Sequence, residues 1–270
     1  MQPDVASAAI LGAVQGLTEF LPVSSSGHIA LGALLFGFED APLTLSIVLH
    51  AGTLLATLAY FRGDLVQLTR DTLHGLRDPR AFAATDSGRT VLGVVIATLP
   101  TVAIALTMRD AVESWQRLPW VVGACLLGSA LAVMLTARGR GTAETLTWSR
   151  ALAVGVAQGL AVLPGLSRSG STIAVAMLLG LRGPAAFRFS FLLSLPAVTG
   201  AVILELGKPG AFDAVPGSVW LGGAIAALVG WLALSALRKV VVLGRFWAFA
   251  VYLVPLGVGL IAGDLIFGWW

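Results

Sequence analysis

The amino-acid sequence predicts an all-α polytopic membrane protein, and three observations carry this prediction. Of the 270 residues, 57% are apolar and only 11% are charged, with a mean hydropathy of +0.90. A soluble domain of this length has about a quarter charged residues and cannot bury so much apolar surface in one core. The other two observations are a series of long apolar segments and an internal repeat of two interrupted ones.

Six apolar segments are long enough to cross a bilayer. The hydrocarbon core is about 30 Å thick, which about 20 residues span in helical conformation. The predicted spans are 41–61, 90–108, 118–137, 184–204, 217–237 and 246–268. The stretch 62–89 mixes Asp and Arg and is predicted to be a solvated loop. The first 20 residues lack a basic start and a small-residue cleavage site, so no cleaved signal peptide is expected.

Two further apolar segments are interrupted halfway by Pro, Gly and hydroxyl-bearing residues. The interruptions are Leu-Pro-Val-Ser-Ser-Ser-Gly-His at 21–28 and Leu-Pro-Gly-Leu-Ser-Arg-Ser-Gly-Ser-Thr at 163–172. Each half is too short to span, and irregular backbone at membrane depth is tolerated only inside protein or beside a wet cavity. Both segments are therefore predicted to be re-entrant hairpins, each made of two short helices joined by a polar tip.

The two hairpins belong to an internal repeat with a period of about half the chain. Gly-Ala-Val-Gln-Gly-Leu at 12–17 matches Gly-Val-Ala-Gln-Gly-Leu at 155–160, and a Leu-Pro pair follows each motif. Each half is then one hairpin plus three full spans, and an odd number of spans inverts the second half relative to the first. The sequence predicts one integral membrane domain, 1–270, with repeat 1 at about 1–137 and repeat 2 at about 150–270.

The basic residues predict the orientation, because cytoplasmic loops collect Lys and Arg. In this topology thirteen basic residues fall on one side and only Arg109, Arg117 and Lys208 on the other. Both termini are then outside, with the first hairpin entering from the outer face and the second from the cytoplasm. The basic residues lie in short runs between the spans, so the pI near 9.6 reflects membrane topology better than nucleic-acid binding, and no nucleic-acid partner is expected. The single cysteine, Cys125, excludes a disulfide within the chain.

The predicted tips carry charged residues, and an ionisable group inside a membrane is a functional candidate by default. Glu19 follows Gln15 by four residues, so the two side chains share one face of the first short helix. Arg168 begins a short helix whose free backbone N–H groups point into the tip. A guanidinium, a helix N-terminus and several hydroxyls together favour a phosphate or diphosphate group. The candidate binding residues are Gln15, Ser24, Ser26, Ser167, Ser169 and Thr172.

Three histidines are considered for proton transfer. His28, three residues after Ser25, can accept or donate a proton near neutral pH beside a buried carboxylate. His50, in the span 41–61, either lines the same cavity or is buried with its hydrogen bonds satisfied, whereas His74 is expected to be inert. The structural alternative is that Glu19 and Arg168 form a buried ion pair that joins the hairpins, while the serines only cap helices.

The interrupted motifs resemble the signature motifs of the bacterial undecaprenyl-diphosphate phosphatase family associated with bacitracin resistance. The matching segments are Glu-Phe-Leu-Pro-Val-Ser-Ser-Ser-Gly-His at 19–28 and Pro-Gly-Leu-Ser-Arg-Ser-Gly-Ser-Thr at 164–172, and the resemblance covers nearly the whole chain. It implies hydrolysis of undecaprenyl diphosphate, which recycles the lipid carrier of cell-wall synthesis and confers bacitracin resistance. It also implies a polyprenyl diphosphate partner, a bacterial inner membrane and a site open to the outer face. The resemblance leaves open whether the protein forms a homodimer.

The residue types, read with this resemblance, suggest a mechanism. Ser25 corresponds to a functional serine of the family motif and is the candidate nucleophile, with Glu19 orienting it or taking its proton. His28 would protonate the leaving phosphate or activate water, and Arg168 would stabilise the charge on the transferring phosphoryl group. A nucleophilic His28 or a direct water attack fits the same sequence.

A divalent cation, Mg or Ca, is a candidate cofactor on charge grounds, because one arginine under-neutralises a diphosphate. Its candidate protein ligand is Glu19. The family motif often has glutamate at both ends, and this chain has Gln15 at the first. The alternative function is a lipid-phosphate flippase or transporter, since inverted repeats with broken helices also build transport sites. A structural membrane scaffold is a third, weaker hypothesis.

Overall fold

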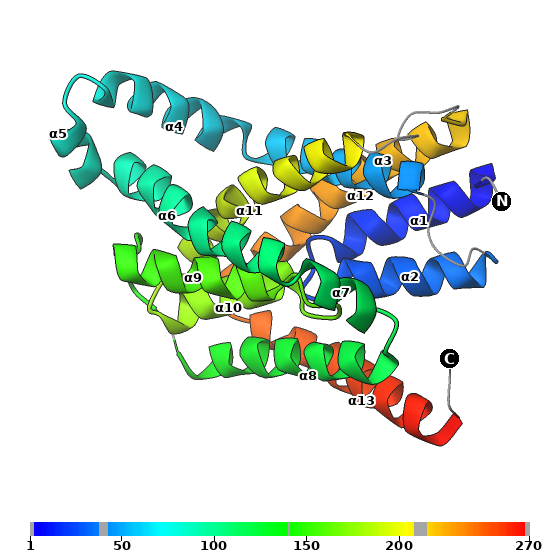
Figure 1. The fold of residues 1–270 in the computed structure, drawn as a ribbon. Coiled ribbons are helices and arrows are strands. Elements are labelled where there is room, and N and C mark those ends of the chain that lie inside the picture. The colour runs from blue at the N-terminus through cyan, green and yellow to red at the C-terminus, as the bar shows by residue number, and fades with distance from the viewer. Residues whose placement is uncertain (1–2, 38–42, 140, 208–214, 268–270) are drawn as a thin grey trace.

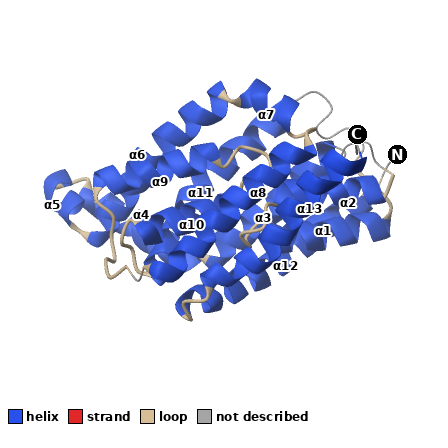
Figure 2. Ribbon diagram, turned by 90° about the horizontal axis from the view of Figure 1, so that it is seen from below, coloured by secondary structure: helices blue, strands red, loops and turns tan. Residues whose placement is uncertain are grey.

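The computed structural model describes residues 3–37, 43–139, 141–207 and 215–267. Within these ranges every regular element is a helix, and the β-bridge between Ala143 and Leu181 is isolated (Figure 2). The longer helices run side by side in an elongated bundle (Figure 1). The start of α1 and the end of α13 lie at one end of this bundle, and α5 lies at the other. The predicted all-α class is confirmed.

The first half of the chain begins with two short helices and continues with longer ones. The helices α1 (Val5–Thr18) and α2 (Ser25–Leu35) flank the first interruption. They are followed by α3 (Leu43–Tyr60), α4 (Arg62–Gly75), α5 (Pro79–Ala84), α6 (Asp86–Thr107), α7 (Arg109–Trp115), α8 (Pro119–Leu135) and the short 3-10 helix η1 (Thr136–Arg138).

The second half repeats this order with fewer small helices. The helices α9 (Trp148–Leu160) and α10 (Arg168–Leu178) flank the second interruption. They are followed by α11 (Gly183–Leu206), α12 (Gly217–Val242), the 3-10 helix η2 (Phe246–Phe249) and α13 (Ala250–Phe267). Both predicted interruptions therefore separate two short helices, as the Pro and Gly positions indicated.

Five helices in the described ranges are long and apolar enough to cross a membrane. They are α6, α8 with η1, α11, α12, and η2 with α13; the pair of α3 and α4, bent by 69°, adds a sixth if it counts as one span. Large apolar side chains such as Leu99 and Leu204 are about two-thirds exposed on these helices. Such surfaces suit hydrocarbon and not water.

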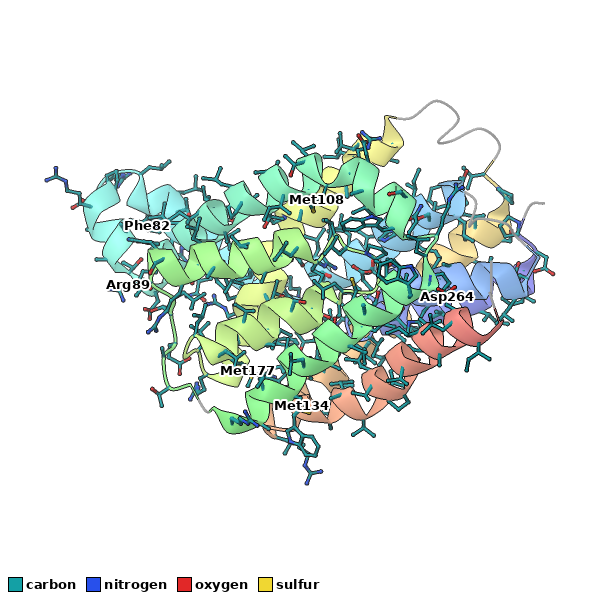
Figure 3. The ribbon with its side chains drawn as sticks, turned by 60° about the horizontal axis from the view of Figure 1, so that its bottom comes forward. Phe82, Arg89, Met108, Met134, Met177 and Asp264 are labelled. Carbon is teal, nitrogen blue, oxygen red and sulfur yellow. The ribbon has the colours of Figure 1, made fainter. Side chains whose placement is uncertain are left out.

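The predicted loop at 62–89 was wrong, because this stretch forms α4, α5 and the start of α6. Leu65 and Leu68 have helical spacing and pack against the core, but the charged residues between the apolar positions obscured this pattern. Thr85 caps α6, where its hydroxyl accepts a hydrogen bond from the Gly88 amide at 3.0 Å. In Figure 3, Arg89 lies at this end of the bundle and Asp264 at the opposite end.

Each hairpin is held in the bundle by a long helix from the other half of the chain. The helix α1 packs along α12, and α9 packs along α6. A Cβ atom at Gly12 would lie 2.3 Å from the Gly222 carbonyl oxygen, and one at Gly155 would lie 2.1 Å from that of Ala97. Only glycine permits these close approaches, which join each interrupted segment to a long helix of the other half.

Candidate active site

Two polar tips meet inside the bundle, and both contain backbone in the left-handed region. In the first tip, Ser24 has φ 68°, and it is the one residue other than glycine with positive φ in the described ranges. In the second tip, Gly165 has φ +93°, and a Cβ atom there would lie 2.3 Å from the Val122 carbonyl oxygen. A non-glycine residue in this region is strained by about 1–3 kcal/mol, and such strain is typical of functional sites.

The local sequence explains how the tips present their charged residues. Glu19 is the C-cap of α1 and lies one turn beyond Gln15, as the spacing predicted. In the second tip, Ser167 caps α10, since its hydroxyl accepts a hydrogen bond from the Gly170 amide at 3.1 Å. Arg168 is therefore the first residue of α10, which confirms its predicted place at a helix N-terminus.

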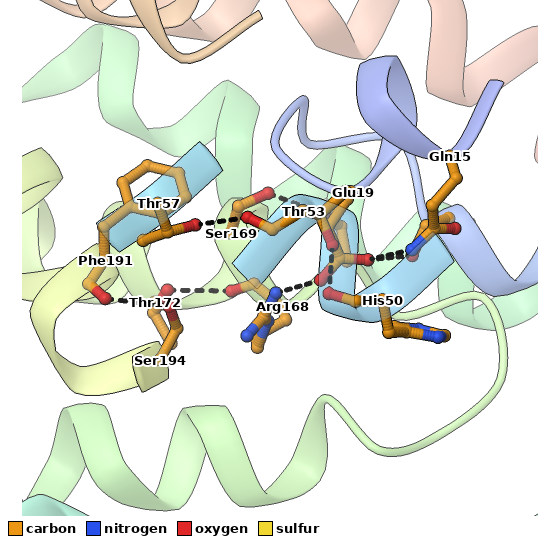
Figure 4. A network of polar contacts seen from close by, with 12 residues as sticks. Gln15, Glu19, His50, Thr53, Thr57, Arg168, Ser169, Thr172, Phe191 and Ser194 are labelled. Atoms are coloured by element: carbon orange, nitrogen blue, oxygen red, sulfur yellow. Dashed lines mark hydrogen bonds and ion pairs between the residues drawn. The ribbon is translucent and has the colours of Figure 1, made fainter. Parts of the chain in front are cut away.

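The Glu19 carboxylate joins both hairpins (Figure 4). Its side chain is 8% exposed, and Oε1 accepts a hydrogen bond from Nη2 of Arg168. The other oxygen, Oε2, accepts from the Ser25 hydroxyl at 2.7 Å and from the Gln15 amide at 3.1 Å. The Ser25 hydroxyl is thus aligned with an anionic acceptor, the arrangement that removes a proton from an attacking hydroxyl.

Arg168 keeps one donor group free. Its side chain is 20% exposed, and Nη2 is bound to Glu19. The other nitrogen, Nη1, is buried and has no hydrogen-bond partner among the described residues. Because a buried unpaired N–H group is destabilising by about 1–3 kcal/mol, Nη1 is matched to an acceptor that the protein does not supply.

The cavity between the tips has a volume of about 280 Å³ and is lined by both polar and apolar residues. The polar lining residues are Thr18, Glu19, Ser24, Ser25, Ser26, His50, Ser167 and Arg168. The apolar lining residues are Ala161, Val162, Leu163, Leu166, Ala197, Val198, Ala201 and Val202. Six of the ten residues predicted from the sequence thus line one cavity.

Three predicted binding residues lie behind this cavity instead of facing it. Gln15 is buried behind Glu19. The Ser169 hydroxyl donates to the Leu21 carbonyl at 3.2 Å, which ties the second tip to the backbone of the first. The Thr172 hydroxyl donates to the Arg168 carbonyl at 2.8 Å and lies 2.5 Å from the Ser190 hydroxyl on α11. These contacts hold the two tips in place.

His28 is outside the cavity wall. Its Nδ1 lies 2.8 Å from the Ser24 carbonyl oxygen, and its Nε2 lies 2.6 Å from the Tyr252 hydroxyl on α13. The two rings stack, with centroids 5.9 Å apart. In this geometry His28 fixes the carbonyl of Ser24, the strained residue next to Ser25.

Several residues at the site were not found from the sequence. Tyr252 and the four small apolar residues of α11 sit in apolar spans, where nothing in the pattern separates them from lipid-facing positions. Ser129 on α8 accepts a hydrogen bond from the Ser167 amide at 2.8 Å. A single hydroxyl in an apolar span is the only signal that marks it.

The described residues do not fit a metal ion held by the protein alone. They contain no group of three His, Cys, Asp or Glu side chains arranged to hold one. Glu19 is the single carboxylate of the cavity wall, and both its oxygens already accept hydrogen bonds. Gln15, beside Glu19, carries a neutral amide and adds no second negative charge.

The family model for "Bacitracin resistance protein BacA" matches residues 8–259. The chain belongs to this family. Together with the apolar spans, membership of the BacA family identifies a multi-pass membrane protein.

Three relatives named undecaprenyl-diphosphatase resemble the chain over nearly its full length. The protein of Methanosphaera stadtmanae is 38% identical over 94% of this chain and 96% of its own. That of Desulforudis audaxviator is 40% identical over 96% and 97%, and that of Desulfatibacillum aliphaticivorans 39% identical over 95% and 98%.

Proposed function

We propose that this BacA-family chain is an enzyme that hydrolyses undecaprenyl diphosphate to undecaprenyl phosphate and inorganic phosphate. This activity recycles the lipid carrier of cell-wall synthesis and confers resistance to bacitracin. The names of the three relatives support the reaction. The main structural support for this reaction is that Ser25, Glu19 and Arg168 line one cavity. There the Ser25 hydroxyl donates to Glu19, and Nη1 of Arg168 has no hydrogen-bond partner among the described residues.

The mixed polar and apolar lining of the cavity suits an amphiphilic substrate. The diphosphate would lie against Arg168, Ser167 and the N-terminus of α10, where a guanidinium and free N–H groups favour an anion. The first part of the hydrocarbon chain would lie against Ala197 and Ala201 on α11. A volume of about 280 Å³ leaves no room for a long polyprenyl chain, so the remainder would lie along the apolar helix surfaces.

In the proposed reaction the Ser25 oxygen attacks the terminal phosphorus. The Ser25 proton passes to Oε2 of Glu19, and the bond between phosphorus and the bridging oxygen breaks to release undecaprenyl phosphate. Water then attacks the phosphoserine, which releases inorganic phosphate and restores the hydroxyl. Arg168 stabilises the charge on the equatorial oxygens in both steps. Direct attack by a water molecule activated by Glu19 gives the same products in one step.

The roles of His28 and of a cation are part of this proposal. In its observed place His28 stabilises the tip through Ser24, and proton transfer to substrate requires its ring to leave Tyr252. A divalent cation would be carried by the phosphates of the substrate, with Glu19 as its one candidate ligand in the cavity wall. Gln15, Ser169 and Thr172 would not contact the substrate. They would position Glu19, the first tip and Arg168, respectively, through their hydrogen bonds.

We also propose an inverted-topology repeat with two re-entrant hairpins in the bacterial inner membrane. The pairing of α1 with α12 corresponds, under the repeat, to the pairing of α9 with α6. The matched glycines Gly12 and Gly155 make these contacts at equivalent positions. The ends of α1 and α13 at one pole of the bundle favour a common side for both termini. The cavity would then open to the outer face.

This orientation is tested by labelling single cysteines in a Cys125→Ser background. Cysteines within 62–89 and 138–150 should react with a membrane-impermeant thiol reagent only after the cell is opened. Cysteines within 205–216 should react in intact cells, because the distribution of basic residues predicts that these segments lie on opposite sides. The reverse pattern, or labelling of both sets from outside, would contradict the proposed orientation.

The rival function is a flippase or transporter with the same fold. Measuring phosphate release by the purified protein in detergent distinguishes this function from hydrolysis. The proposal predicts stoichiometric release of phosphate from undecaprenyl diphosphate, whereas transport alone releases none. The same assay with and without a chelator measures the need for a divalent cation.

A further inference from the structure

His50 on α3 is the one histidine among the residues that line the catalytic cavity. Its Nδ1 lies 2.9 Å from the Ser46 carbonyl oxygen, and a carbonyl only accepts. The hydrogen of the ring is therefore on Nδ1 when the imidazole is neutral. Among the described residues, Nε2 has no hydrogen-bond partner. A second proton would bind at Nε2 and turn it into a donor.

Protonation of His50 changes the net charge of the residues that line the cavity. Glu19 contributes one negative charge and Arg168 one positive charge, so the formal charge of the wall is zero while His50 is neutral. A phosphate monoester end alone carries about −1.5 to −2 charges near pH 7. Protonation of His50 is the step that gives the described wall a net positive charge.

The helices α1, α4, α11 and α12 pack against α3 and carry further titratable groups, among them Asp4 at the N-cap of α1. His50 lines the same cavity as Glu19 and Arg168. Asp64 on α4, Arg188 on α11 and Arg238 on α12 surround a second cavity beside Tyr60. Tyr60 is ten residues along α3, or about 15 Å of helix.

We propose that His50 binds the substrate diphosphate as an imidazolium and donates its Nε2–H to a phosphate oxygen. This inference rests on the proposed function and concerns capture of the substrate, not proton transfer to the leaving group. A bound phosphate favours the protonated imidazole, so the proposal expects stronger substrate binding at low pH than at high pH. Charge-assisted hydrogen bonds are about twice as strong as neutral ones.

The test compares wild type with His50→Gln, His50→Ala and the control His74→Gln between pH 5.5 and 8.5. His74 is a matched control because it lies on α4, outside the cavity wall. In wild type, kcat/KM for phosphate release should fall about tenfold or more over this range, which corresponds to one charge-assisted contact. Glutamine donates at every pH, so His50→Gln should lack this part of the decline and keep kcat within about twofold.

The remaining variants separate a contact from a structural role. His50→Ala has no donor, so its KM should rise about tenfold at pH 6 with kcat nearly unchanged, and His74→Gln should match wild type. The substrate's own ionisation is common to all variants and cancels in their comparison. An unchanged slope in His50→Gln, a fall of kcat without a rise of KM, or a slope abolished by His28→Gln would each overturn the proposal.

A binding measurement tests the role of His50 independently of hydrolysis. The probe is a methylene-diphosphonate analogue of the lipid, whose P–C–P link resists hydrolysis. Wild type should bind it about tenfold more tightly at pH 6 than at pH 8, and His50→Gln should show no such difference. If wild type releases no phosphate, the proposed function fails, while the binding measurement still decides on His50. Equal affinity of wild type at both pH values would overturn the role of His50.

Discussion

The Arg168→Lys variant is expected to lose about two orders of magnitude or more in single-turnover phosphate release. The guanidinium holds Glu19 through Nη2 and leaves Nη1 free for the substrate. A lysine ammonium keeps the charge but lacks the planar fork, so it cannot make both contacts in the same geometry. The loss of a donor that stabilises transition-state charge is worth a few kcal/mol, which corresponds to this fall in rate.

The matched control for this variant is Arg188→Lys. Arg188 is also a partly exposed arginine paired with a carboxylate, Asp64, but it lies beside the second cavity. Its replacement should keep turnover within about threefold. The ion pair with Glu19 persists in Arg168→Lys, so that variant should still fold and elute as wild type does. Near-normal turnover would make Arg168 the structural ion-pair partner of the alternative hypothesis.

Ser25→Ala is expected to abolish hydrolysis while binding of the lipid diphosphate persists. The substitution removes the attacking oxygen, and the binding groups of Arg168, Ser167 and the α10 N-terminus stay in place. The measurement is single-turnover release with substrate labelled on the terminal phosphate, followed by rapid quenching and mapping of any phosphoenzyme. Label on Ser25 in wild type supports the covalent route.

The control for the serine is Ser235→Ala, whose hydroxyl donates to the Trp231 carbonyl of its own helix at 3.0 Å and does not line the cavity. It should release phosphate as wild type does. An acid-labile label on His28 would make that residue the nucleophile. Substantial turnover by Ser25→Ala would instead favour attack by water activated by Glu19.

Much of the fold follows from residue order and length alone. Apolar segments of about 20 residues become helices, and Pro and Gly at the interruptions end them. The neighbourhood of Gln15 and Glu19 follows from helical spacing, and the place of Arg168 follows from the Ser167 cap. These features are local, so a pattern in one segment predicts them.

The direction of a side chain at a tip depends on distant segments, and here the sequence was less informative. His28 turns to Tyr252, 224 residues away along the chain, and no local pattern indicates which helix packs there. Thr172 faces Ser190 on α11 for the same reason. In α4, Leu65 and Leu68 are masked by neighbouring charges, although their spacing is helical. Tertiary packing decided each of these cases.

The central claim is that the tips carrying Glu19 and Arg168 form a diphosphate site. It is tested most directly by an experimental structure with the methylene-diphosphonate analogue bound. The account predicts the diphosphonate in the cavity of about 280 Å³, with oxygen atoms within hydrogen-bond distance of Nη1 of Arg168 and its terminal phosphorus facing the Ser25 hydroxyl. A diphosphonate bound instead in the cavity of about 630 Å³ beside Tyr60 and Arg238, with the Arg168 donor still unpaired, would contradict it.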